Sequence, residues 1–252
     1  MIESLHSPHV ARVKALVGSK GVRERKEAGL FVAEGAQSLK EALHSKPAVK
    51  SLYLTSLGRN RIGELDLSGI DVFEVSEEVM SAMSTTMTPQ GIVALCELPE
   101  KTLDLPEISR AIYLHEIQDP GNAGTILRSA DAMGMSAVFT SPGSVDMYSP
   151  KVVRATAGSL WHIPLFEEIS FENLVKRYPE ADLLSLTASG KESINEINFD
   201  NPTIALFGNE ARGLAGDIIS RTRSVHIPMK GRAESLNLSA AASIVMYEMS
   251  QR

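Results

Sequence analysis

Short apolar runs alternate with amphipathic stretches along the chain, and this alternation predicts an α/β protein. In the first hundred residues, apolar positions at helical spacing predict helices at 6–18, 37–45 and 76–84. Continuous apolar runs between them predict strands at 30–35, 49–56, 71–76 and 91–98. Ser7, followed by Pro8, and Ser76 precede two of the helices, and serine is a preferred N-cap residue. These elements predict a small α/β unit.

The second half of the chain alternates more regularly. Near-continuous apolar runs predict strands at 111–117, 136–141, 163–168, 182–188, 203–208 and 224–229. Helical patterns between and after them predict helices at 124–133, 149–161, 171–178 and 236–250. Buried strands that alternate with helices predict a mostly parallel sheet with helices on both faces.

The stretch 98–109 interrupts this periodicity. It contains Pro99 and Pro106 and alternates charged residues with single leucines, as linkers do. We therefore predict three parts: a domain at 1–98, a linker at 99–109 and a second domain at 110–252.

Charge is distributed unevenly along the 252 residues. The whole chain carries a formal charge of −6, yet residues 1–60 contain ten Lys and Arg against five acids. A basic segment on an acidic body is expected where one part contacts phosphates, although a solvated helix face gives the same count.

Several classes of chemistry find no support. Cys96 is the only cysteine, which excludes an internal disulfide and a zinc site with two thiolates. The six histidines form no HxxxH or HExxH pattern, and no GxSxG nucleophile elbow occurs. We expect no metal centre. No run approaches the roughly 18 apolar residues of a membrane span, so we expect a cytoplasmic protein that does not enter membranes.

The first candidate motif is HEIQDPGNAGTILRSADAMG at 115–134, which runs from a strand into a helix. It lacks the third glycine of a Rossmann fingerprint and the Lys-Ser/Thr of a P-loop. Gly121 and Gly124 flank Asn122, and Arg128 lies one turn into the helix. Arg128 is the candidate functional residue of this motif, because open α/β sheets bind ligands at the carboxyl ends of their strands. Alternatively, Arg128 pairs with Asp131 on the helix surface.

Two further motifs, LFGNEARGL at 206–214 and IPMKGRAESLNLSAAASIVMYEM at 227–249, lead from a strand through a glycine-bearing loop towards a helix. Backbone groups in such loops are free to bind a polar ligand. Glu210 is placed to orient Arg128 or a substrate hydroxyl, or to favour the following helix. Ser235 or Asn237 caps the last helix in the simplest interpretation.

Together, the three motifs resemble those of the SpoU (TrmH-like) family, S-adenosylmethionine-dependent RNA ribose 2′-O-methyltransferases of the trefoil-knotted SPOUT superfamily. HVARVKAL, GLFVAEGAQSLKEAL and TPQGIVAL resemble the N-terminal RNA-binding domain of its 23S ribosomal RNA members, which is related to ribosomal proteins. The resemblance implies a deep C-terminal knot, a homodimer joined through the methyltransferase domain, and S-adenosylmethionine as cofactor.

The resemblance also implies site residues. It assigns catalytic positions to Asn122, Arg128, Glu210, Ser235 and Asn237. It assigns cofactor binding to Leu206, Phe207, Gly208, Asn209, Gly213, Ile227, Pro228, Met229, Ser235, Leu236, Asn237 and Leu238. The basic front segment then becomes an RNA-binding surface, with Arg12, Lys14, Lys20, Arg23, Arg25 and Lys26 as candidates.

In the mechanism we expect, Arg128 holds a phosphate and stabilises developing alkoxide charge, while Glu210 or the phosphate accepts the 2′-OH proton. A guanidinium of pKa above 12 is a poor base. The alternatives are a transfer-RNA 2′-O-methyltransferase and a non-catalytic RNA-binding or ribosome-assembly protein with the same fold. A nucleotide-using Rossmann enzyme is less favoured, because the fingerprint is absent.

Overall fold

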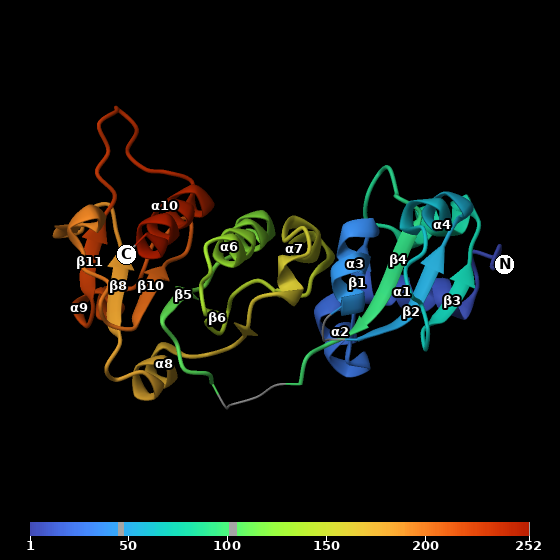
Figure 1. Ribbon diagram of the computed structural model, residues 1–252, viewed down its shortest axis with the longest axis horizontal. Coiled ribbons are helices and arrows are strands. Elements are labelled where there is room, and N and C mark those ends of the chain that lie inside the picture. The colour runs from blue at the N-terminus through green and yellow to red at the C-terminus, as the bar shows by residue number, and fades with distance from the viewer. Residues whose placement is uncertain (45–47, 101–104, 252) are drawn as a thin grey trace. The chain divides into compact units, whose positions relative to one another are not determined.

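The computed structural model describes residues 1–44, 48–100 and 105–251, which form two compact units (Figure 1). The first unit comprises Met1–Glu100 and Asp146–His162, and the second comprises Lys101–Val145 and Ile163–Arg252. Position 45, the predicted end of a helix, and positions 101–104 of the predicted linker lie outside the described residues.

The first unit is built on a four-stranded sheet in the order β1-β4-β2-β3. Its strands are β1 (Leu30–Glu34), β2 (Val49–Leu54), β3 (Asp71–Glu74) and β4 (Ile92–Glu97). Its helices are α1 (Pro8–Val17), α2 (Gly21–Ala28), α3 (Ala36–His44), α4 (Ser56–Ile62), α5 (Glu77–Met83) and α7 (Pro150–Ala155), with a 3₁₀ turn η1 (Ser159–Trp161). Both predicted caps are confirmed: Ser7 accepts from His9 N and Ser76 from Val79 N.

The segment Asp146–His162 folds with the first unit, although the sequence prediction placed it in the C-terminal domain. The guanidinium of Arg25 forms an ion pair with Asp146, with Nε donating to Oδ2 at 2.9 Å. The rings of Tyr148 and Trp161 pack on Phe31 of β1, with centroids 5.1 and 6.0 Å away. These contacts explain the association, which joins parts of the chain more than a hundred residues apart.

The second unit contains a seven-stranded sheet in the order β7-β6-β5-β10-β8-β11-β9, and every neighbouring pair is parallel. Its strands are β5 (Arg110–Leu114), β6 (Ala137–Thr140), β7 (Leu165–Phe166), β8 (Asp182–Leu186), β9 (Glu192–Ser193), β10 (Thr203–Phe207) and β11 (Arg223–His226). Its helices are α6 (Pro120–Ala132), α8 (Phe171–Arg177), α9 (Gly216–Ser220) and α10 (Leu238–Ser250), with a 3₁₀ turn η2 (Ile194–Glu196). The predicted parallel sheet is confirmed.

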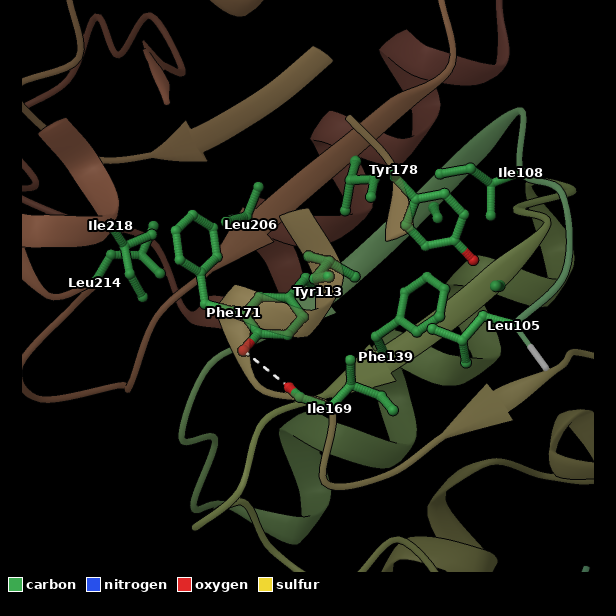
Figure 2. Close-up of a cluster of buried hydrophobic side chains, with 14 residues drawn as sticks. Leu105, Ile108, Tyr113, Phe139, Ile169, Phe171, Tyr178, Leu206, Leu214 and Ile218 are labelled. Carbon is green, nitrogen blue, oxygen red and sulfur yellow. Dashed lines mark hydrogen bonds between the residues drawn. The ribbon is translucent and has the colours of Figure 1, made fainter. Parts of the chain in front are cut away.

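One face of this sheet carries an aromatic core (Figure 2). Tyr113 lies at its centre and donates a hydrogen bond to the carbonyl of Ile169 at 3.1 Å. Helices α8 and α9 contribute residues to this cluster, whereas α6 and α10 do not and instead contact β6 and β10. Helices therefore cover both faces. Leu105 and Ile108 are buried in the same core, so the last residues of the predicted linker belong to the folded unit.

The strand order places a topological switch between β5 and β10. From β5 the chain continues to β6 and β7 on one side, and then crosses to β8 on the other. The loops after β5 and β10 therefore diverge at the carboxyl edge of the sheet, the usual ligand site of open α/β folds. Helices α6 and α10 follow these loops and pack together, with Ser129 Oγ 2.9 Å from Ser243 Oγ.

Candidate active site

Three of the predicted catalytic side chains meet at this carboxyl edge. Asn122 lies in the first turn of α6, Glu210 follows β10, and Asn237 is the N-cap of α10. Asn237 Nδ2 donates to Asn122 Oδ1 at 3.0 Å, and Asn122 Nδ2 donates to Glu210 Oε1 at 3.4 Å. A single chain of hydrogen bonds thus joins residues from all three sequence motifs.

Asn237 also organises the start of its own helix. Its Oδ1 accepts from the backbone N–H of Ser239 at 2.9 Å and of Ala240 at 3.3 Å. Of the two capping candidates, Asn237 is therefore the cap. With its oxygen held by the helix, the amide nitrogen faces Asn122, and capping fixes the orientation of the side chain.

The side chain of Glu210 is a carboxylate that accepts several hydrogen bonds. Its carboxylate accepts from the backbone N–H of Gln118 at 3.1 Å and of Asp119 at 3.0 Å, in addition to Asn122. Burial raises the pKa of this carboxyl, but hydrogen bonds from three backbone N–H groups and from Asn122 outweigh burial and bring the pKa below its usual value. A carboxylate stabilised in this way is a weak base, which does not favour the proton-accepting role expected from the sequence.

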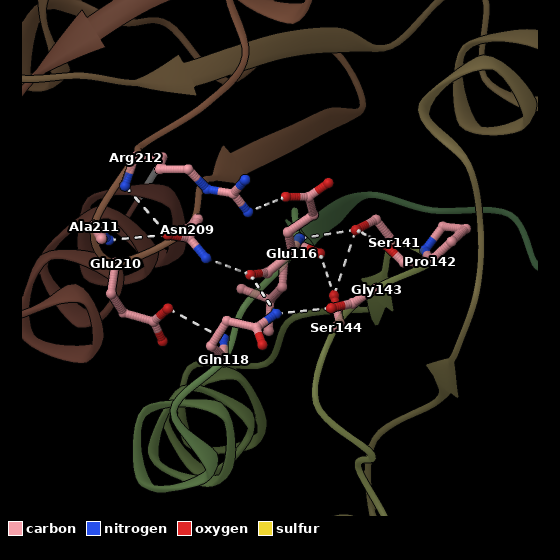
Figure 3. Close-up of polar contacts among 11 residues, drawn as sticks. Glu116, Gln118, Ser141, Pro142, Gly143, Ser144, Asn209, Glu210, Ala211 and Arg212 are labelled. Carbon is pink, nitrogen blue, oxygen red and sulfur yellow. Dashed lines mark hydrogen bonds and ion pairs between the residues drawn. The ribbon is translucent and has the colours of Figure 1, made fainter.

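Glu116, in the loop after β5, is hydrogen-bonded to the loops after β6 and β10 (Figure 3). Its backbone N–H donates to Ser141 Oγ at 2.8 Å, and its carbonyl accepts from Asn209 Nδ2 at 2.9 Å and Gln118 Nε2 at 3.1 Å. Its carboxylate pairs with Arg212 at 2.6 Å. Glu116 adopts a φ of 52°, a conformation that is strained for a residue with a side chain.

Asn209 belongs to the same network of hydrogen bonds. The residue is buried, and its Oδ1 accepts from the backbone N–H groups of Ala211 and Arg212 while its Nδ2 holds Glu116 (Figure 3). Its backbone pairs with Gly213 in both directions, at 3.1 and 2.8 Å. Every polar group of the side chain has a partner, so Asn209 shapes the loop that carries Glu210.

A cavity of about 300 Å³ opens beside the hydrogen-bonded residues. Its lining includes nine of the twelve predicted cofactor residues: Gly208, Asn209, Gly213, Ile227, Met229, Ser235, Leu236, Asn237 and Leu238. It also includes Asn122 and Glu210. Leu206, Phe207 and Pro228 are not among the lining residues, and the first two have side chains buried in the core. Ser235 lines the cavity but is not the helix cap.

Another part of the lining contains none of the predicted site residues. Leu186 ends β8, and Thr187 and Ala188 follow it. Because β8 pairs with β10 in parallel, the loop that they begin lies at the same edge. Glu234 and Ala241 complete the lining. Only the strand order places this loop at the cavity, because the sequence LTAS at 186–189 contains no distinctive motif.

Arg128 does not join the other predicted catalytic residues. It lies six residues after Asn122 on α6, about 600° of helical turn, and therefore projects from another side of the helix. The side chain is exposed, forms no hydrogen bond or ion pair with the described residues, and does not line the cavity. The proposed pair with Asp131 is not formed.

The predicted RNA-binding cations differ in accessibility. Arg12, Lys14, Lys20 and Lys26 are exposed, and Arg23 forms an exposed ion pair with Glu27 at 2.7 Å. Arg25 was wrongly assigned to this surface: it is 4% exposed and bound to Asp146 and to the carbonyl of Leu16. A guanidinium held in this way is unavailable to phosphates.

Across residues 1–44, 48–100 and 105–251, no group of three or more His, Cys, Asp or Glu is arranged to hold a metal ion. No helix in the same ranges combines the length and apolar character needed to cross a membrane.

Comparisons with known proteins agree with the fold and the motifs. Residues 109–247 match the SpoU rRNA Methylase family, and residues 10–94 match the MRM3-like substrate binding domain. A 23S rRNA (guanosine(2553)-2′-O)-methyltransferase from Bacillus subtilis, RlmP, is 32% identical, with 98% of each chain covered. A 23S rRNA (uridine(2479)-2′-O)-methyltransferase from Streptomyces viridochromogenes is 30% identical over 93% of this chain and 86% of that protein.

Among solved structures, the AdoMet-bound rRNA methyltransferase from Sinorhizobium meliloti superposes with a TM-score of 0.87 at 30% identity, covering 99% of this chain and 97% of that chain. The similarity thus extends over both units and includes a chain that binds the methyl donor. The chain belongs to the SpoU rRNA methylase family.

Proposed function

We propose that this protein transfers a methyl group from S-adenosylmethionine to a ribose 2′-hydroxyl of 23S ribosomal RNA. The observation that carries the proposal is the hydrogen-bonded chain Asn237–Asn122–Glu210 at the rim of a cavity that the three motifs line together. The two named relatives with this activity support 23S rRNA as substrate, and each modifies a different nucleotide.

The cavity fits S-adenosylmethionine, which supplies an activated methyl group when bound. Its lining combines apolar side chains with polar groups, as required for a ligand with apolar and charged parts. Ile227, Leu236 and Leu238 are the apolar walls that would hold it. The tight turn after β10 requires glycine at position 208, because a Cβ there would lie 2.1 Å from the backbone carbonyl carbon of Gly213. Many of the hydrogen bonds to S-adenosylmethionine would come from backbone N–H and C=O groups of these loops.

In this mechanism the Asn residues position the ribose. Asn122 lies between a fixed donor and a fixed acceptor, so its amide is oriented before RNA arrives. Glu210 stays ionised and orients Asn122 through Oε1, while a phosphate of the RNA is the better acceptor for the hydroxyl proton. Ser235 lines the cavity and is available to hydrogen-bond the ligand.

Arg128 requires a second chain in this proposal. The outer face of α10 exposes Ile244 at 39% and Tyr247 at 54%, and α10 packs beside α6, which carries Arg128. Apolar exposure on this pair of helices supports a homodimer through the methyltransferase domain, with Arg128 of one copy serving the cavity of the other. Mixing inactive R128A with inactive N237A tests this: restored activity is expected, and continued inactivity contradicts it.

The family resemblance supports three further inferences. We infer that the C-terminal segment forms a trefoil knot, that the N-terminal α/β unit is an RNA-binding domain related to ribosomal proteins, and that the enzyme works in the cytoplasm on ribosomal RNA. The domain division that we propose is 1–98, 99–109 and 110–252, with 146–162 packed on the first unit.

The decisive experiment incubates the protein with radiolabelled S-adenosylmethionine and either 23S rRNA or bulk transfer RNA transcribed in vitro. Label in 23S rRNA, mapped to a 2′-O-methyl nucleotide, is expected. Label in transfer RNA alone identifies the transfer-RNA alternative. Calorimetry with S-adenosylmethionine distinguishes the non-catalytic alternative, which would bind RNA but neither bind nor consume the cofactor.

A further inference from the structure

The four-stranded sheet of the first unit brings several loops to one edge. The ends of β1 and β2 lie beside the start of β4, because both strands are antiparallel to it. The loop 84–91 before β4 therefore meets the turns after β1 and β2. Gly58 approaches so closely that a Cβ there would lie 1.9 Å from the carbonyl oxygen of Gly91.

The loop 84–91 is polar and exposed, yet firmly held. Glu34 at the end of β1 accepts from the backbone N–H of Thr85 at 3.0 Å, from its hydroxyl at 2.5 Å, and from the hydroxyl of Ser84. Gln90 Oε1 accepts from the N–H of Ala36 at 3.1 Å, which leaves the amide NH₂ of Gln90 available. The carboxylate of Glu34 is therefore hydrogen-bonded to Ser84 and Thr85 of the loop. Met87, at the tip of the loop, is fully exposed.

Helix α7 adds positive charge next to this loop. Val152 and Val153 are buried within the first unit, whereas Lys151 and Arg154 are exposed, three residues apart on one helix. Arg154 Nη1 donates to the hydroxyl of Thr85 at 2.9 Å, so the helix lies beside the loop. The Arg25–Asp146 ion pair and the packing of Tyr148 on Phe31 anchor the preceding segment.

We propose that loop 84–91 and the outer face of α7 form one RNA-binding surface, with Lys151 and Arg154 contacting phosphates and Met87 contacting an unstacked base of an RNA loop. Cations give affinity for the backbone, and an exposed apolar side chain among hydroxyl and amide groups suits a base. This inference rests on the proposed function, because it concerns how the substrate RNA is bound. It implies that a helix from the methylase segment of the sequence completes the substrate-binding domain, whose family model ends at residue 94.

The test measures binding of in vitro-transcribed 23S rRNA to the full chain as salt is varied. The K151Q/R154Q variant should weaken binding roughly tenfold, and the slope of log K against log salt should fall by about 1.4, for two lost contacts to single-stranded phosphates. M87A should weaken binding several-fold without changing the slope. The control K176Q/K191Q removes two exposed cations of the second unit, and should change the affinity and the salt slope less than K151Q/R154Q does.

Unchanged affinity and slope in K151Q/R154Q, with loss in R12Q/K14Q instead, would overturn the proposal in favour of the α1–α2 surface. If K151Q/R154Q unfolds, M87A decides, because a fully exposed side chain contributes little to stability. Failure of the proposed function is seen separately: the wild-type protein would then bind rRNA through this surface without methylating it.

Discussion

Asn237 donates a hydrogen bond from Nδ2 to Oδ1 of Asn122 across 3.0 Å, joining the N-cap of α10 to the first turn of α6. The two residues are 115 positions apart in the sequence. The same Asn237 caps α10 with its other side-chain atom. Helix capping and orientation of the candidate catalytic residue are therefore functions of one side chain.

Replacing Asn237 separates these two functions. In N237D the carboxylate still caps the helix, but the donor to Asn122 is lost, so stability should be kept while methylation falls about a hundredfold. N237A loses both, and should in addition lose about 1 kcal/mol of stability. Thermal unfolding and single-turnover methylation check this pair. An N237D enzyme with wild-type activity would show that the contact is not needed.

The lowered pKa of Glu210 predicts how the stability of the protein depends on pH. Its folded-state pKa lies below the ordinary value of 4.5, so the stability that it contributes is present above that value and is lost as the pH falls through the folded pKa. The difference in unfolding free energy between the wild type and E210Q should therefore be constant from pH 6 to 8 and shrink below about pH 4.5. Urea unfolding at several pH values measures it, and a difference that grows on acidification contradicts the assignment.

The strained backbone of Glu116 gives a matched pair of variants. Both E116G and E116A lose the ion pair with Arg212, but only glycine adopts a φ of 52° without a steric penalty. E116G should therefore be more stable than E116A by up to about 1 kcal/mol. Because the loop also positions the N–H donors to Glu210, both should lower kcat more than the KM for S-adenosylmethionine. Equal stability of the two variants would show that the strain is negligible.

The sequence was informative wherever local chemistry decides the structure. Ser7 and Ser76 identified helix starts, and the apolar strands of 111–208 identified a parallel sheet. Helices α2 and α4 were not predicted, because GVRERKEA and SLGRNRI lack an extended apolar stripe. The motifs by themselves indicated Glu210 as a functional residue and Asn237 as a possible cap, whereas the catalytic positions of Asn122 and Asn237 came only from the family resemblance.

What could not be predicted depends on distant partners. The burial of Arg25 requires Asp146, 121 residues later, and a cation in a basic stretch gives no sign of such a partner. The exposed position of Arg128 depends on which face of α6 packs on the sheet and on α10. The contribution of 186–188 to the cavity depends on the strand order.

Arg25 should act on stability. R25A leaves the largely buried Asp146 without its cation and should cost about 3 kcal/mol, whereas R23A removes an exposed ion pair and should cost less than about 1 kcal/mol. Urea unfolding compares the two. If the two losses are equal, the Arg25–Asp146 pair does not anchor the segment 146–162 as described.

Deleting residues 1–100 tests how independent the second unit is. The cavity is lined only by residues of the second unit, so a fragment of 101–252 should still bind S-adenosylmethionine, and it should no longer methylate rRNA. The deletion also removes Phe31 and Arg25, the partners of Tyr148, Trp161 and Asp146. The fragment should therefore bind a hydrophobic dye and associate beyond the expected dimer, and W161S/Y148S should reduce both effects. A fragment that methylates rRNA at the full rate would contradict the substrate-binding role of the first unit. A fragment that forms nothing larger than the expected dimer and binds no dye would show that 146–162 folds without that unit.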